Sequence, residues 1–109
     1  MIKVTIYKNS NNEYVGFKSM GHAGYAEHGQ DIVCAGVSAL TINFVNSIEK
    51  FTEDKFELKT DEKKGLIKFS FKEKISPEAK LLMNSMILGL QGILKDYKTD
   101  YIHIVFKEV

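Results

Sequence analysis

The sequence is poor in cysteine and proline and has no large excess of either charge. Cys34 is the single cysteine among 109 residues, which excludes a secreted domain held together by internal disulfides. With 15 basic and 14 acidic residues the net charge is +1, unlike the strongly basic balance of most nucleic-acid-binding domains. The remaining composition, 44% hydrophobic and 27% charged, is typical of one globular domain, which we expect to span residues 1–109.

The N-terminus also lacks a targeting signal. Residues 1–8 alternate apolar and polar side chains, whereas a signal peptide needs a continuous apolar region. No apolar run in the sequence approaches the length of a membrane span. We therefore expect a cytoplasmic protein with no membrane contact, and the charge balance predicts no direct binding to nucleic acid.

The order of the predicted elements is β-β-α-β-β-α-β. Residues 1–8 and 13–20 are expected to form a hairpin of two strands, because apolar residues alternate on either side of an asparagine-rich turn. A glycine-containing loop over 21–33 leads to a helix over 32–50. Two strands follow, at 56–58 and 66–71, then a helix over 76–97 and a last strand over 101–106. Such an order favours a two-layer α/β sandwich, in which two helices pack on a mixed five-stranded sheet.

Helix boundaries are predicted from capping residues. Asp31 is a plausible N-cap of the first helix, since its carboxylate can accept backbone N–H groups of the first turn. Ser76 and Pro77 are a typical start for the second helix, with a cap followed by a proline. Gly89 and Gly92 interrupt that helix and are expected to allow close packing.

The segment 21–40 contains the residues with possible chemistry. If Asp31 caps the helix, Cys34 lies in its first turn, where the helix dipole favours a thiolate. His22 stands twelve residues earlier in a loop that Gly21, Gly24 and Gly29 would allow to bend. His22 could then take the thiol proton, and backbone amides at the helix start could stabilise an oxyanion.

Simpler interpretations stay open at this stage. A lone cysteine on an apolar helix is often a small buried hydrophobe. His22, His28 and Cys34 could together hold a metal, although they lack the paired spacing of zinc motifs. Asp31 could orient His22 or act only as a cap, and Ser38, one turn after Cys34, could be a hydrogen-bond partner or a packing residue.

The same segment resembles the ribosomal-processing cysteine protease family, Prp. The resemblance rests on three short runs, which are Gly21-His22-Ala23, Gly29-x-Asp31-Ile32-Val33-Cys34-Ala35 and Val37-Ser38-Ala39-Leu40. It covers essentially the whole chain, since length and element order also fit. It implies that Cys34 is the nucleophile, that His22 is the catalytic histidine, and that Asp31 and Ser38 support the site.

The resemblance also implies a substrate. Family members are cytoplasmic homodimers that remove the N-terminal extension of the bacterial large-subunit ribosomal protein L-twenty-seven, cutting after aromatic residues during ribosome assembly. We expect peptide hydrolysis without metal or cofactor. Two alternatives remain, namely a non-catalytic ribosome-assembly or peptide-binding module and a thiol redox sensor built on Cys34.

Overall fold

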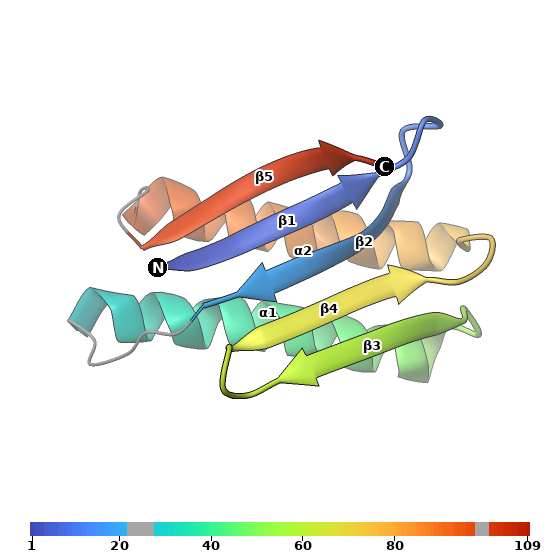
Figure 1. Cartoon of the computed structure of the whole chain (residues 1–109). Helices are drawn as coiled ribbons and strands as arrows, with labels where there is room; N and C mark the ends of the chain where they lie inside the picture. Colours follow the sequence, from blue (N-terminus) through green and yellow to red (C-terminus); the bar gives the residue numbers. More distant parts are fainter. Residues whose placement is uncertain (22–27, 98–100) are drawn as a thin grey trace.

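The structure is a computed structural model that describes the backbone of residues 1–21, 28–97 and 101–109, and the side chains of these residues except 28–31. The described elements are, in chain order, β1 (Ile2–Lys8), β2 (Tyr14–Met20), α1 (His28–Phe51), β3 (Phe56–Asp61), β4 (Leu66–Phe71), α2 (Pro77–Tyr97) and β5 (Ile102–Glu108). This order confirms the predicted one (Figure 1).

The strands form one mixed sheet in the order β3-β4-β2-β1-β5. β1 pairs in parallel with β5, while the β1–β2, β2–β4 and β3–β4 pairs are antiparallel. Both helices lie on the same side of the sheet, behind it in Figure 1. The chain is therefore the two-layer α/β sandwich that the sequence predicted, and neither of the described helices lies on the opposite face of the sheet.

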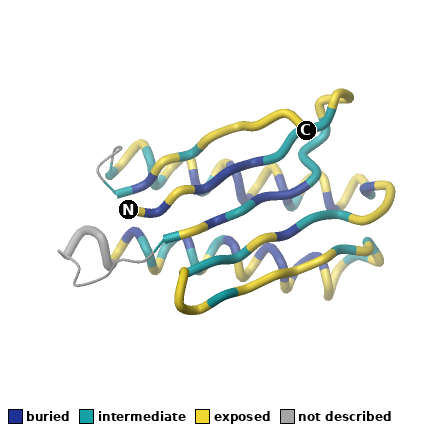
Figure 2. The backbone as a smooth tube through the Cα atoms, viewed as in Figure 1, coloured by how far each residue is buried: buried dark blue, intermediate teal, exposed yellow. Residues whose placement is uncertain are grey.

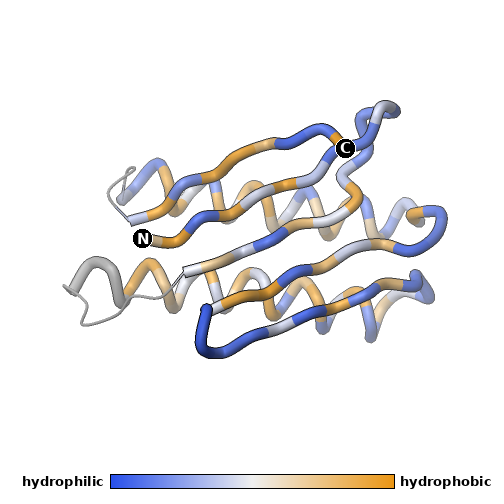
Figure 3. The backbone as a smooth tube through the Cα atoms, viewed as in Figure 1, coloured by the Kyte–Doolittle hydropathy of each residue, from blue (hydrophilic) through white to orange (hydrophobic). Residues whose placement is uncertain are grey.

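The core lies between the sheet and the helices and is centred on aromatic rings. Ile2, Val4 and Ile6 of β1 are buried on the helix side, as the alternation along a strand requires (Figures 2 and 3). Phe69 of β4 stacks on Phe17 of β2 with ring centres 5.7 Å apart. Phe44 of α1 meets Phe69 edge-on at 4.9 Å, in a geometry that aromatic pairs prefer. These contacts fix α1 against the middle of the sheet.

The first helix begins earlier than the sequence predicted. α1 starts at His28, so Asp31 is inside the helix and the prediction that it is the N-cap is wrong. The error arose because residues 28–31 are polar or glycine, and the apolar stripe becomes visible only at Ile32. Its portion from Ile32 to Phe51 has a mean hydropathy of 1.4 and is long enough to span a membrane. In this structure its buried residues, among them Val37, Phe44 and Ile48, belong to the core between the helices and the sheet.

The second helix begins as predicted. The Ser76 hydroxyl accepts the Ala79 N–H at 3.1 Å, and Pro77 is the first helical residue. A side chain at Gly89 would lie 2.9 Å from Leu40 of α1, so this glycine allows the two helices to approach. No atom lies within 4 Å of the corresponding position at Gly92, which gives that glycine no packing role among the described residues.

Candidate active site

Cys34 lies on α1 at the end of the molecule where β2 ends. Its thiol is free and half-buried. Since α1 begins at His28, Cys34 is in the second helical turn. The helix dipole acts mainly within the first turn. Cys34 therefore lies farther from the positive end of the helix than the sequence predicted. Within the described part of α1, the unpaired amides of that start belong to residues 28–30, more than one turn before Cys34.

A cleft of about 410 Å³ opens beside Cys34. It lies where the first half of α1 meets the ends of β2 and β3 and the start of β4. Apolar side chains form much of its wall, namely Ile2, Val37, Ile42, Leu66 and Ile67. Polar side chains line the rest, namely Ser19, Ser38, Thr41, Thr60, Asp61 and Glu62, together with Gly21 and Gly65. A thiol beside an apolar cleft of this kind can meet the carbonyl carbon of a bound peptide.

The turn between β3 and β4 forms one rim of the cleft. The Asp61 carboxylate accepts the Lys63 and Lys64 N–H groups at 3.0 and 3.3 Å, which stabilises the turn. The Lys64 carbonyl in turn accepts the Gly21 N–H at 3.3 Å, joining the turn to the end of β2. The sequence identified 61–65 only as a turn, and no motif in it indicated a place beside Cys34.

Gly21 is held in a conformation that favours glycine. Its φ is +124°, and a Cβ there would lie 2.3 Å from the Met1 carbonyl oxygen. Glycine is therefore favoured at position 21 by its positive φ and by its close approach to Met1. The predicted role of Gly21 in letting the loop bend stays a prediction. Gly29, which was predicted to belong to the loop, lies inside α1.

Ser38 lines the cleft one turn after Cys34, on the same side of α1. The next turn is held by Thr41, whose hydroxyl donates to the Val37 carbonyl at 2.9 Å. Because Thr41 is fully buried, this bond satisfies a polar group at the base of the cleft. The structure thus brings Cys34, Ser38 and Gly21 together.

Other predicted site residues cannot be placed. His22, Gly24 and the side chains of His28 and Asp31 lie outside the described residues. Their roles remain predictions, including the metal alternative. Among the described side chains, no three of the metal-binding types come together.

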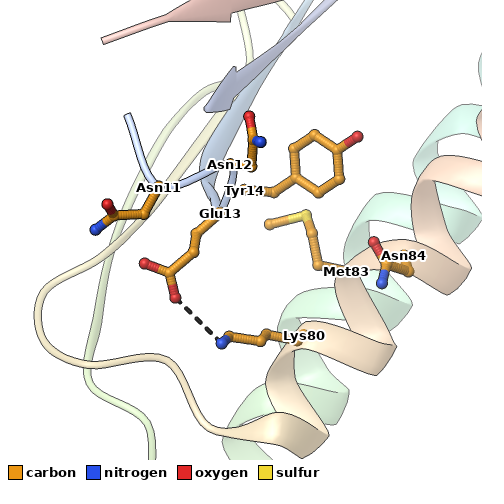
Figure 4. A pocket seen from close by; sticks show the side chains of 7 residues that line it. All are labelled: Asn11, Asn12, Glu13, Tyr14, Lys80, Met83 and Asn84. Carbon is orange, nitrogen blue, oxygen red and sulfur yellow. Dashed lines mark ion pairs between the residues drawn. The ribbon is translucent and has the colours of Figure 1, made fainter. Parts of the chain in front are cut away.

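A second pocket, of about 250 Å³, lies at the opposite end of the sheet (Figure 4). The turn between β1 and β2 and the first turns of α2 form it, and Glu13 and Lys80 pair across its edge at 3.2 Å. None of the predicted site residues lines it. It is therefore separate from the cleft beside Cys34.

This fold and the cleft beside a free thiol are those of a small α/β protein that can use a cysteine nucleophile. Comparisons with known proteins identify the family to which the chain belongs. The family model described as cysteine protease Prp matches residues 1–103. The chain belongs to this family of cysteine proteases.

Individual relatives support the assignment along nearly the whole chain. The ribosomal processing cysteine protease Prp of Bacillus subtilis is 39% identical over 92% of this chain and 93% of its own length. That of Staphylococcus aureus strain Mu50 is 33% identical, over 92% of this chain and 94% of its own length.

Solved structures of the Staphylococcus aureus protease also match. One, in complex with a substrate peptide, is 31% identical with a TM-score of 0.91. Another, in complex with a covalently linked product peptide, is 32% identical with a TM-score of 0.88. Each match covers 98% of this chain and 100% of the other chain. The predicted family is thereby confirmed.

Proposed function

We propose that this chain removes the N-terminal extension of the large-subunit ribosomal protein L-twenty-seven by cutting after an aromatic residue. The observation that carries the proposal is the half-buried thiol of Cys34 at the wall of a cleft of about 410 Å³. Relatives at 33–39% identity are named ribosomal processing proteases. A related structure holds a covalently linked product peptide, which agrees with nucleophilic catalysis.

The proposed reaction uses one nucleophile and one base. The Cys34 sulfur attacks the peptide carbonyl carbon while His22 takes the thiol proton. His22 then gives this proton to the leaving amine as the C–N bond breaks, which leaves a thioester on Cys34. Water, deprotonated by His22, hydrolyses the thioester and frees the thiol. No oxyanion donor is assigned to the start of α1, because its unpaired amides precede Cys34 by more than one turn.

The walls of the cleft support the proposed preference for an aromatic residue. Val37 and Ile42 of α1 face the same cleft as Leu66 and Ile67 of β4. Burial of an aromatic ring among such side chains is favourable because it removes a large apolar area from water. Ser38 lines the same cleft one turn after Cys34, where its hydroxyl could hydrogen-bond a peptide group.

Mass spectrometry of a synthetic extension peptide tests the proposal. We expect wild type to cut it after the aromatic residue, and Cys34→Ala to lose at least about 10³-fold in rate because the nucleophile is gone. The helix should tolerate alanine, so the melting temperature should stay near that of wild type. His22→Ala should lose turnover in the same way.

Two further measurements distinguish the proposed cleavage from its alternatives. A peptide with alanine in place of the aromatic residue should be cut much more slowly than the original. Cleavage by Cys34→Ala at the wild-type rate would exclude this mechanism. A wild-type protein that binds the peptide but leaves it intact after prolonged incubation would instead favour a peptide-binding module.

We also propose that the protein acts in the cytoplasm as a homodimer. The support is its membership of the family and its close match to relatives along almost their full length. Light scattering after size-exclusion chromatography should give about twice the 12.4 kDa mass of the chain. A mass of one chain at micromolar concentration would contradict the dimer.

A further inference from the structure

The sheet face opposite the helices, here called the open face, concentrates positive charge. It carries the side chains that alternate with the core residues along each strand, and Figure 1 looks directly onto it. On β1, β2, β4 and β5 its charged side chains are Lys3, Lys18, Lys68 and Lys107, with His103 beside them. On β3 it carries Lys59 between Glu57 and Asp61. Although the net charge of the chain is only +1, the fold places these lysines together on one face of the sheet.

Three of these lysines stand in a row across neighbouring strands. Lys18 pairs in register with Lys68, and Lys68 pairs with Lys59. Directly opposed side chains in antiparallel strands lie about 5 Å apart, and like charges there destabilise the sheet. Among the described residues no acid forms an ion pair with any of the three. The only ion pair of Glu57 among them is with Lys72. A polyanion bound over the row would reduce the electrostatic repulsion among the three lysine side chains.

Two hollows adjoin the lysine row on the same face. One, of about 400 Å³, is lined by Tyr7, Gly16, Ser70 and Lys107 among others, and the second, also of about 400 Å³, includes Glu57 and Lys59. Lys68 and Ser70 line both. Tyr7 lies in register with Gly16, where a Cβ would clash with the Phe69 carbonyl oxygen of β4. The hollow beside Tyr7 is also lined by Ser70 and Lys107.

We propose that the open face binds single-stranded RNA. The lysine row would lie along the phosphates, and an unpaired base would enter the hollow beside Tyr7. Single-stranded nucleic acids are bound in this way by basic surfaces that also present aromatic rings for stacking. The prediction of no nucleic-acid binding used net charge alone, which does not show how a fold distributes charge over its faces.

The hollow favours RNA over an acidic protein segment. A carboxylate-rich segment would be held by the lysines alone and would leave the hollow beside Tyr7 unused. A nucleotide uses both, since its base can stack on Tyr7 while its phosphate meets Lys68 or Lys107. The hydroxyls of Ser70 and Tyr7 can also bond a ribose 2′-hydroxyl, which DNA lacks.

The lysine row and its two hollows share no residue with the cleft beside Cys34. No lysine lines the cleft beside Cys34, and the hollows of the open face include neither Cys34 nor Ser38. The inference therefore stands whether or not the proposed peptide cleavage is observed.

Fluorescence anisotropy with labelled oligonucleotides of about 20 nucleotides tests the inference. Wild type should bind mixed-sequence RNA, with a slope of log affinity against log salt of about −3 if four to five phosphates are contacted. A triple variant, Lys18→Gln with Lys59→Gln and Lys68→Gln, should bind at least about tenfold more weakly and reduce the slope by about 2. Tyr7→Leu should weaken binding without changing the salt slope, because it removes stacking and keeps the charge.

A matched triple variant separates the face from the net charge. Lys50→Gln with Lys74→Gln and Lys95→Gln removes the same charge from exposed positions outside the open face, and its affinity should change less than about twofold. Circular dichroism should show that both triple variants are folded. Equal losses in the two triple variants, or no binding by wild type at low salt, would overturn the proposal. DNA of the same sequence binding as tightly as RNA, or polyglutamate competing equally well, would overturn the assignment to RNA.

Discussion

Strand ends, helix ends and turns form both ends of the sheet, but the two ends differ in how their polar and reactive side chains are used. At the far end, which comprises residues 9–13, 52–55 and 72–77, polar side chains bond to one another and to the backbone. At the cleft end, which comprises Gly21, Cys34 and residues 61–65, a hollow of about 410 Å³ lies beside the free thiol of Cys34. The far end has hollows too, of about 250 and 490 Å³, but their walls contain no cysteine. One end holds the layers together and the other exposes a reactive group.

Asp54 is the centre of the far end. Its carboxylate accepts the Ser76 hydroxyl at 2.6 Å and the Ser76 N–H at 2.8 Å. Because Ser76 also caps α2, one carboxylate connects the segment after α1 to the start of α2. Partial burial raises the pKa of Asp54, but the bonds from Ser76 outweigh it and hold the pKa below its ordinary value.

This difference indicates that the fold can accommodate a reactive site at the cleft end. Stability comes from the aromatic core and from the bonded end, so the cleft end is free to keep a half-exposed thiol and partly exposed polar groups. Substitutions at the two ends should therefore separate turnover from stability.

The largest effect on turnover among the supporting residues is expected for Gly21→Ala. The new Cβ would meet the Met1 carbonyl oxygen at 2.3 Å in a backbone with φ of +124°, so the end of β2 must shift. His22 is the next residue in the chain, and a displacement of about 1 Å at a catalytic group can cost about 10²-fold in rate. Peptide cleavage and thermal unfolding, measured together, check this.

Gly65→Ala is the matched control for Gly21. Gly65 also lines the cleft with a positive φ, of 59°, so alanine there should lower stability by about 1 kcal/mol. It is not adjacent to His22, and turnover should change little. Equal losses of turnover in both variants would mean that backbone strain at the rim, and not the position of Gly21, limits the reaction.

The fold was largely predictable from the sequence because its elements carry local signals. Alternation identified the strands, and Ser76 with Pro77 marked the start of α2. The start of α1 was not predictable, since the polar residues before Ile32 show no apolar periodicity. Strand order was also beyond reach, because no local pattern states that β4 pairs with β2.

The candidate site was predictable only where it is local. Cys34 and Ser38 share one helix face, so their spacing alone placed them together. Asp61 and Leu66 reach the same cleft only through the pairing of β2 with β4 and the bond from Gly21 to the Lys64 carbonyl. Contacts of this kind depend on tertiary structure, and nothing in the 61–65 turn distinguishes it from an ordinary surface turn.

At the far end, Asp54→Asn should reduce stability and leave turnover unchanged. Hydrogen bonds to charged groups contribute about 1.5–3 kcal/mol, and we expect a loss of about 1 kcal/mol here because Asp54 is only half-buried. Urea unfolding checks the size of the loss. Glu53→Gln, which removes an exposed neighbouring charge, is the matched control and should be close to wild type. A large drop in cleavage by Asp54→Asn would contradict the separation of the two ends.

The pH dependence of this difference follows from the sign of the pKa shift. The pKa of Asp54 is lower in the folded protein than its ordinary value of 3.8. The Asp54 carboxylate therefore contributes fully to the free energy of unfolding at pH values above its pKa in the unfolded chain. This contribution is lost as the pH falls through the pKa of Asp54 in the folded protein. The difference in unfolding free energy between wild type and Asp54→Asn should be constant near pH 6 and shrink below about pH 4. A difference that grows on acidification would contradict the assignment of the stabilising form to the carboxylate.

The smallest effect is expected for Glu13→Gln at the rim of the second pocket, where Glu13 meets Lys80 (Figure 4). Bonds from the Asn9 amide and from Lys80 lower the pKa of Glu13, but a partly exposed ion pair of this kind contributes little to stability. The change should lie within the error of a thermal melt. Asn9→Ala is the sharper comparison, because the Asn9 side chain accepts the backbone N–H groups of Asn11 and Glu13 at 2.9 and 3.0 Å. It should lower the melting temperature clearly, since those amides lose their acceptor. If Glu13→Gln were equally harmful, the far end would depend on its ion pair more than on its turn.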